Sequence, residues 1–208
     1  MNCKKLILAS ALVGVLATPA FAGEVENGNN YARLSAGAII PEDINGTAGA
    51  TSVKIKFDTG WTVSAAVGTW LNDNIALEGE LGYLSADFKD GTAAGVTVAI
   101  DGNFESTLLM ANLNYHFAGK KAAFDPYIGV GAGAAFSKIK LNSVGGIAFN
   151  QSDTSTDAAA QATAGLNFNV DSGVNLGVQY RYLYTDTGSN GTDAFTAHNL
   201  TANVTFAF

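Results

Sequence analysis

Residues 158–170 read AAAQATAGLNFNV. Apolar side chains occupy every second position from Ala160 to Val170, and polar residues or glycine stand between them. Residues two apart lie on the same face of a β-strand, so this stretch predicts a strand with one apolar and one polar face. The same alternation recurs in seven further stretches, which are 31–40, 56–70, 75–88, 104–117, 126–139, 174–185 and the residues leading to Phe208. We therefore expect an all-β chain of eight strands.

The segments between these stretches alternate in length. Four are long or polar, at 41–53, 89–103, 140–157 and 186–193, and three are shorter, at 71–74, 118–125 and 171–173. Outer-membrane barrels combine long loops outside, short turns at the periplasmic end and an even number of strands. The sequence therefore predicts an eight-stranded antiparallel up-and-down transmembrane β-barrel.

Two apolar runs depart from the simple pattern. Leu108 and Met110 fall on the polar face of their strand and are exceptions to the alternation. Val96, Val98 and Ile100 alternate inside the second long segment. Such a run predicts either a hairpin that continues beyond the membrane or an edge for strand addition to a partner, and we favour the hairpin.

The first 22 residues have the composition of a signal peptide. Lys4 and Lys5 precede an apolar stretch from Leu6 to Ala17, which is followed by Ala20-Phe21-Ala22. We expect cleavage before Gly23, so that residues 23–208 form one barrel domain. Cys3 is then removed, which leaves no thiol for a disulfide or a metal. Loss of the two lysines leaves 9 of the 11 basic residues against 18 acidic ones, a formal charge of −9 that makes nucleic acid an unsuitable partner.

The alternation does not by itself say which face of the barrel points outward. A lipocalin-like periplasmic binder would enclose its apolar face, whereas a membrane barrel turns that face to lipid. Many alanines on the apolar face and aromatic residues at the ends of the apolar runs favour the membrane barrel. The other face would then form a lumen, where a salt-bridge network is expected from six charged residues, Arg33, Lys56, Asp58, Glu78, Glu80 and Arg181.

Three short motifs resemble the opacity-protein and outer-membrane β-barrel superfamily. They are PYIGVGAG at 126–133, QYRY at 179–182 and AHN at 197–199, which leads to Phe208. The resemblance implies a Gram-negative outer membrane with lipid and lipopolysaccharide around the barrel. It also implies insertion by the barrel-assembly machinery, for which Val204, Phe206 and Phe208 resemble the carboxy-terminal signal. A surface protein, adhesin or surface antigen is the implied role, with a host or cell-surface ligand bound through the loops.

Lipid A deacylases and palmitoyl transferases are also eight-stranded outer-membrane barrels, so an enzyme is an alternative function for this fold. Nucleophilic catalysis needs a serine beside an oriented histidine, but Leu200 stands where a deacylase-like motif after His198 would have serine. His116 lies at the opposite, periplasmic end of the barrel, on the lumen face of its strand, and we interpret both histidines as solvated or interfacial. Gly129, Gly131 and Gly133 lack the spacing of a phosphate loop and are expected to make room inside the barrel.

The sequence thus predicts a non-enzymatic surface barrel with no catalytic, cofactor or metal site. A small porin-like channel is the alternative, although side chains nearly fill the lumen of an eight-stranded barrel. A lipid A-modifying enzyme and a lipocalin-like binder are the less favoured alternatives.

Overall fold

The computed structural model describes residues 29–48, 51–120, 122–171, 173–186 and 194–208. The predicted signal peptide and its cleavage site lie outside these residues. Within them the chain forms ten β-strands, and no helix there is long and apolar enough to cross a membrane. The strands are β1 (Asn30–Pro41), β2 (Ile44–Ala48), β3 (Thr51–Phe57), β4 (Gly60–Trp70), β5 (Ile75–Ala93), β6 (Val96–His116), β7 (Phe124–Val144), β8 (Ile147–Asp171), β9 (Val174–Asp186) and β10 (Phe195–Ala207).

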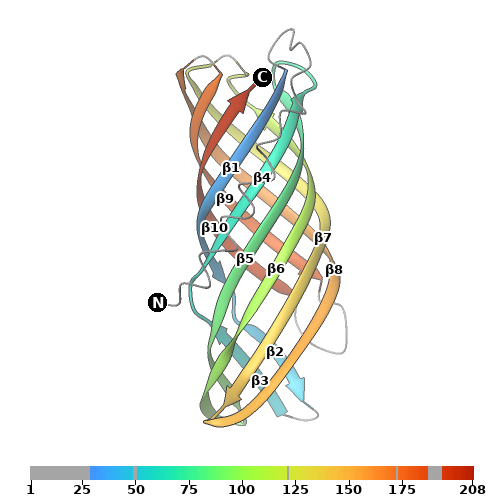
Figure 1. Ribbon diagram of the computed structural model, residues 1–208, viewed down its shortest axis with the longest axis vertical. Helices are drawn as coiled ribbons and strands as arrows, with labels where there is room; N and C mark the ends of the chain where they lie inside the picture. Colours follow the sequence, from blue (N-terminus) through green and yellow to red (C-terminus); the bar gives the residue numbers. More distant parts are fainter. Residues whose placement is uncertain (1–28, 49–50, 121, 172, 187–193) are drawn as a thin grey trace.

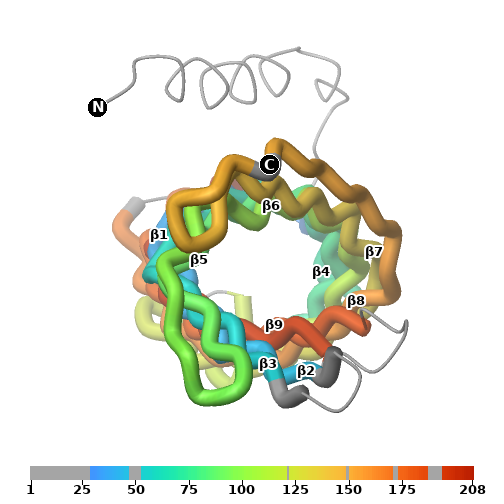
Figure 2. Tube along the Cα trace, turned by 90° about the horizontal axis from the view of Figure 1, so that it is seen from below, coloured from blue at the N-terminus to red at the C-terminus, as the bar shows by residue number. Residues whose placement is uncertain are grey.

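Eight of these strands close into a ring in the order β1, β4, β5, β6, β7, β8, β9, β10. All neighbours are antiparallel, and β10 returns to β1 with Phe206 opposite Ala32. Figures 1 and 2 show the tilted strands and the closed ring. Closure leaves no unpaired strand edge along the ring, which is what a lipid environment requires. The predicted eight-stranded up-and-down barrel is confirmed.

The two ends of the barrel differ. At one end, hereafter the turn end, residues 71–74 connect β4 to β5, residues 117–120 follow β6, and the backbones of Asn30 and Phe208 are hydrogen-bonded to each other. At the other end, hereafter the hairpin end, β5, β6, β7 and β8 extend well beyond the ends of β1, β4, β9 and β10. Strand β3 pairs with this part of β5, and β2 pairs with β3.

The long strands change the predicted loops. Val96, Val98 and Ile100 belong to β6, so the predicted extension of the second hairpin is confirmed. The predicted loop at 140–157 is wrong, because β7 and β8 pair almost continuously up to Val144 and Ile147. Its Asn, Gly and Asp residues suggested a loop, but backbone pairing between β7 and β8 outweighs their low strand propensity.

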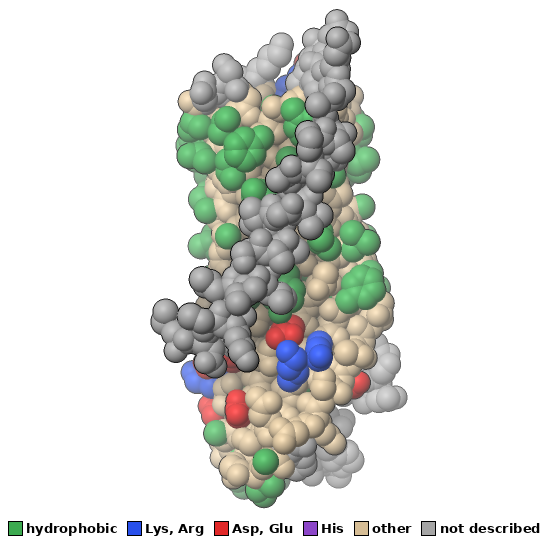
Figure 3. Space-filling view, in the orientation of Figure 1, with side chains coloured by type: hydrophobic (Ala, Val, Ile, Leu, Met, Phe, Trp, Pro, Cys, Tyr) green, Lys and Arg blue, Asp and Glu red, His purple; other side chains and the backbone are tan. Residues whose placement is uncertain are grey.

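The apolar face points outward. Large apolar side chains such as Leu109, Leu113, Ile128 and Val130 are about half exposed, while Gln161, Thr163 and Asn112 are buried inside the ring. Green apolar side chains cover much of the barrel wall in Figure 3, and charged groups on this face gather toward the hairpin end. The prediction of an outward apolar face is confirmed, and the lipocalin-like arrangement is excluded.

One strand was predicted with the wrong phase. The predicted strand 56–70 is broken at Asp58 and Thr59, between β3 and β4, and the pairing of β3 with β5 shifts register before Phe57. Phe57 consequently packs inward against Phe104 and Phe195, whereas Trp61 points outward. A break of this kind reverses the face on which each residue lies.

Candidate functional site

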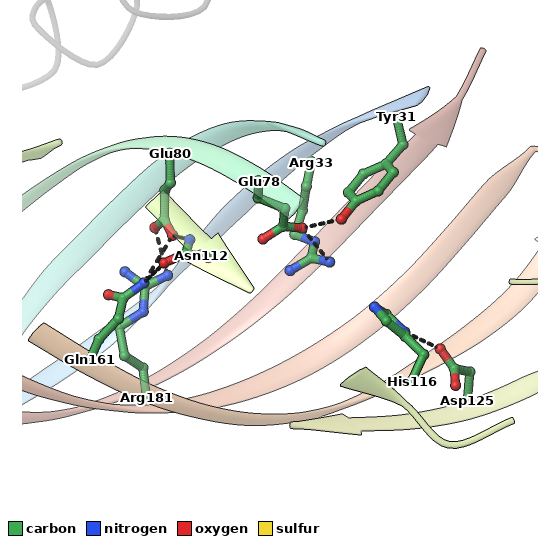
Figure 4. A network of polar contacts seen from close by, with 9 residues as sticks. All are labelled: Tyr31, Arg33, Glu78, Glu80, Asn112, His116, Asp125, Gln161 and Arg181. Atoms are coloured by element: carbon green, nitrogen blue, oxygen red, sulfur yellow. Dashed lines mark hydrogen bonds and ion pairs between the residues drawn. The ribbon is translucent and has the colours of Figure 1, made fainter. Parts of the chain in front are cut away.

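Two buried ion pairs cross the middle of the barrel (Figure 4). The Arg33 guanidinium lies 2.8 Å from a Glu78 carboxylate oxygen, and the Tyr31 hydroxyl donates to the same oxygen at 2.7 Å. The Arg181 guanidinium lies 2.6 Å from Glu80. All four charged side chains are at least nine-tenths buried. Four of the six predicted network residues are therefore brought together as two pairs.

Neutral side chains complete the second pair. Asn112 donates to Glu80 at 2.8 Å, and Gln161 donates to the Asn112 carbonyl oxygen at 2.7 Å. A methyl group at Gly131 would overlap the Asn112 side chain, and one at Gly129 would overlap that of Asn114. These two glycines make room for interior side chains, as predicted. Gly133 differs, because its added methyl group would overlap the backbone of β6 at Leu109.

Lys56 and Asp58 do not belong to this network, which corrects the prediction. Asp58 is about half exposed and lies 3.6 Å from Lys89. Lys56 is on the opposite face of β3 from the inward Phe57. Both residues lie outside the lumen because the strand is interrupted between β3 and β4.

A second polar group lies nearer the turn end. His116 is buried and its Nδ1 is hydrogen-bonded to Asp125, whose other oxygen accepts from the backbone of Ala118 at 3.3 Å. The imidazole stacks on Tyr127 with ring centroids 5.0 Å apart and contacts Trp70 at 4.5 Å. His116 lies on the inner face, as predicted, but it is buried beside a carboxylate, so the interpretation of a solvated or interfacial histidine was wrong.

The hairpin half of the interior is mainly apolar, which the sequence pattern did not predict. Buried side chains from seven ring strands form a cluster there, and Ile44, Phe57 and Phe88 pack against it. The cluster consists of Ile39, Leu84, Phe104, Leu108, Met110, Ala135, Ala159, Leu183, Phe195 and Ala197. Leu108 and Met110, treated as exceptions in the sequence, were the signal for it. The interior is therefore polar toward the turn end and apolar toward the hairpin end.

The outer surface carries a hydrogen-bonded chain at the rim of the hairpin end. The Tyr180 hydroxyl lies 2.6 Å from His198 Nδ1, and His198 Nε2 lies 3.0 Å from Glu42. Thr196 donates to the other Glu42 oxygen at 2.6 Å. Hydrogen bonds from Thr196 and His198 lower the pKa of the Glu42 carboxyl below its usual value. His198 is partly exposed here, as expected. These hydrogen bonds connect the segment after β1 to β9 and β10.

A charged group lies on another side of the barrel, where β6 pairs with β5 and β7. Lys140 donates to both oxygens of Glu105 at 2.9 Å, and Asn103 donates at 2.7 Å. Partial burial of Glu105 would raise its pKa, but these hydrogen bonds and the charges of Lys140 and Lys138 outweigh burial and lower it. Glu105 lies opposite Lys138 and Ser85, two positions beyond the Tyr83–Thr107–Phe136 row of paired residues.

The predicted carboxy-terminal signal residues lie on β10 and just after it. Phe206 is about half exposed on the outer wall, and Val204 is opposite Leu34 and Leu176. The Phe208 backbone pairs with that of Asn30. Their role in insertion stays a prediction.

Three comparisons place the chain among known proteins. A family model described as "Outer membrane protein beta-barrel domain" matches residues 8–208. A Rickettsia felis protein named "Putative adhesin" is 26% identical over 225 residues, which cover 98% of this chain and 99% of that protein. The crystal structure of Neisserial surface protein A has a TM-score of 0.58 and 17% identity, covering 88% of this chain and 98% of the other. The outer membrane protease OmpT from Escherichia coli has a TM-score of 0.52 and 11% identity, covering 89% and 99%. The two solved structures share the fold, and one of them is an enzyme.

Proposed function

The chain belongs to the outer membrane protein β-barrel domain family and is located in the cell outer membrane, and from this premise we propose that it is a non-enzymatic surface adhesin. In such barrels the short turns face the periplasm and the long connections face outward. The turn end is then periplasmic and the hairpin end extracellular. Binding to a host or cell-surface ligand would take place at the hairpin end.

The observation that supports this proposal is the sheet that stands above the membrane band. Outward aromatic residues mark the band's extracellular boundary, among them Trp61, Tyr83 and Tyr184. Beyond that boundary β2, β3, β5, β6, β7 and β8 pair in this order, while β1, β4, β9 and β10 stop near it. A paired sheet holds its surface in one shape, so a ligand would meet little conformational entropy cost from the protein. The full-length similarity to a Rickettsia protein named as an adhesin supports the same role.

The interior gives no support to the alternative of a small channel. Ions would have to pass both the buried pairs of Arg33 and Arg181 and the apolar cluster around Phe104. An apolar constriction excludes ions by excluding water.

The non-enzymatic part of the proposal rests on the surroundings of the two histidines. His198 is hydrogen-bonded to Tyr180 and Glu42 rather than to a serine, and His116 is enclosed in the barrel. The test is the mass of lipid A from bacteria with and without the protein. We expect identical masses, and gain or loss of an acyl chain would show the non-enzymatic assignment to be wrong.

Adhesion is tested by expressing the chain in a non-adherent Escherichia coli strain and counting bacteria bound to host cells. In one variant Asn-Gly replaces residues 142–150, so that Leu141 and Gln151 flank a two-residue hairpin turn. In a second, Asn-Gly replaces residues 92–97 between Gly91 and Val98. We expect the full chain to confer binding and at least one variant to lose most of it.

The matched control is Lys120→Gln, which changes a charge at the turn end and should leave binding unchanged. All variants are compared at equal amounts of folded protein in the outer membrane. Equal binding by the trimmed variants and the full chain would contradict a role for the extracellular sheet.

A further inference from the structure

A cavity of about 330 Å³ opens at the turn end of the barrel. Its wall includes Tyr31 and Trp70 on one side and His116 and Asp125 on another, and Arg33 also lines it. Lys120 lies in the turn after β6 and also lines the cavity. The adhesive surface proposed above is at the opposite end of the barrel, so this cavity has no part in that function.

Several buried polar atoms around the cavity have no hydrogen-bond partner among the described residues. They are Arg33 Nε, His116 Nε2, Thr205 Oγ1 and Asn167 Oδ1, and all four side chains are more than nine-tenths buried. The ring edge with His116 Nε2 turns away from Asp125 and toward Arg33 (Figure 4). A buried polar group without a partner costs free energy, so these atoms favour a guest that hydrogen-bonds to them.

The two cations of the cavity have donors to spare, whereas each oxygen of its carboxylate already accepts a hydrogen bond. Both oxygens of Asp125 are taken, by His116 and by the Ala118 amide. Arg33 uses its terminal nitrogen for Glu78 and keeps Nε–H free. The Lys120 ammonium donates to Asn29 and is 3.7 Å from Asp73, so one of its three hydrogens is available to a guest. We propose that this cavity is a periplasmic binding site for a small carboxylate.

The other groups suit the same ligand. The Thr205 hydroxyl can donate to a carboxylate, and the Asn167 amide can present its NH₂ group after a flip of the side chain. His116 Nε2 donates when the ring is protonated and otherwise accepts from a ligand hydroxyl. Tyr31 and Trp70, whose ring centroids are 6.0 Å apart, provide apolar surface for the body of the ligand. Planar carboxylates such as benzoate should therefore bind more tightly than acetate.

Water is the competing occupant. A cavity of this size has room for about ten water molecules, and waters would also satisfy the free polar atoms. Hydration alone would give no preference between a carboxylate and a neutral molecule of the same shape. That preference is therefore the quantity to measure.

The two tryptophans allow the measurement in the intact protein. Trp70 lines the cavity, whereas Trp61 is on the outer wall beside Tyr83. The full chain, folded in lipid nanodiscs, is titrated with benzoate while both indole N–H signals are followed by NMR. We expect a saturable shift of the Trp70 signal and a constant Trp61 signal. Benzamide, the neutral counterpart, should not shift Trp70; an equal shift with benzamide or none with benzoate would overturn the proposal.

Two variants locate the site without breaking the Arg33–Glu78 pair. Lys120→Gln and Thr205→Val should each weaken benzoate binding about fivefold. Lys140→Gln, at the extracellular end, removes the same charge and should leave the affinity unchanged. Equal weakening by Lys120→Gln and Lys140→Gln would indicate a general charge effect and overturn the proposal.

The carboxylate could come from a free acid or from the end of a peptide. Alanyl-alanine with a free carboxyl group and the same dipeptide with an amide end separate these sources. Binding of only the free-carboxyl dipeptide would extend the site to peptide ends, and binding of benzoate but neither dipeptide would restrict it to small acids. Equal binding of both dipeptides would show that the site does not recognise a carboxylate.

Discussion

The interior arginines and glutamates illustrate how single residues are constrained by closure of the barrel. Eight strands bring Arg33 and Arg181 within hydrogen-bonding distance of Glu78 and Glu80, although Arg181 and Glu80 are 101 positions apart. A buried charge without its partner loses the interaction that offsets its desolvation, so each pair depends on both members. The hydrogen bond from Asn112 further satisfies Glu80.

Glu80→Gln should therefore destabilise the barrel more than loss of the whole pair. The substitution leaves Arg181 buried and without a counter-charge, and we expect a loss of about 3 kcal/mol in the free energy of unfolding. The double variant Glu80→Gln with Arg181→Met should recover part of this loss, because no buried charge remains. Urea unfolding from lipid vesicles, followed by tryptophan fluorescence, measures both. A single variant as stable as the parent would contradict the prediction.

Residue patterns predicted the pairs but not the apolar layer above them. Alternation correctly assigned Arg33, Glu78, Glu80 and Arg181 to the inner face, because a continuous strand keeps its phase. Leu108 and Met110 were apolar residues on the same face, and nothing in a single strand says that other strands place apolar residues beside them. The layer exists only because seven strands contribute to it.

At the scale of the elements, the two-residue break between β3 and β4 determines which face of the barrel the neighbouring residues occupy. Asp58 and Thr59 interrupt what seemed one strand, and the phase on the two sides differs. Lys56 and Asp58 were assigned to the lumen for that reason alone. A register shift depends on pairing with β5, which is distant in sequence, so periodicity within one strand cannot locate it.

The extracellular hairpins are held partly by charge, and Glu105 gives a test of this. Its lowered pKa means that the ionised form is favoured in the folded state. The resulting stabilisation is present above the usual glutamate pKa and is lost as the pH falls through the lowered value. Because Lys140 is more than one-third exposed, solvent screening limits the effect to about 0.5 kcal/mol.

Glu105→Gln should accordingly speed amide hydrogen exchange in the outer parts of β6 and β7 at neutral pH, by about twofold. The difference from the parent should disappear well below pH ~4, where the parent's carboxyl group is also neutral. Asp153→Asn is the matched control, since within the described part of the chain the Asp153 carboxylate accepts a hydrogen bond only from the backbone of Thr154. An unchanged difference at acid pH would show that the ion pair is not its cause.

For the whole molecule, the closed ring predicts how the protein behaves on a gel. Every ring strand is hydrogen-bonded on both sides, so detergent has no free edge from which to unfold it. Protein extracted from the outer membrane should migrate differently in SDS before and after boiling. A protein that is recovered from the periplasm and shows no shift would contradict both the location and the closed barrel.

Two barriers of different chemistry lie in series along the axis, and this arrangement makes the last prediction specific. The ion pairs can be neutralised without touching the apolar cluster, and the cluster can be made polar without touching the pairs. If both block ions, neither change should open a path. The wild type, Glu80→Gln with Arg181→Gln, and Phe104→Ser with Leu108→Ser should all be silent in planar bilayers, and only the combined variant should conduct.

Each variant is measured after its heat-shifted mobility shows that the barrel is folded. Lys140→Gln controls for charge changes outside the lumen and should be silent. Conductance by the charge variant alone would mean that water already crosses the Phe104 layer, so that the ion pairs are the only barrier. Stable conductance by the wild type would make the small channel the better account of the protein, because an apolar constriction closed by ten side chains could not then be dry.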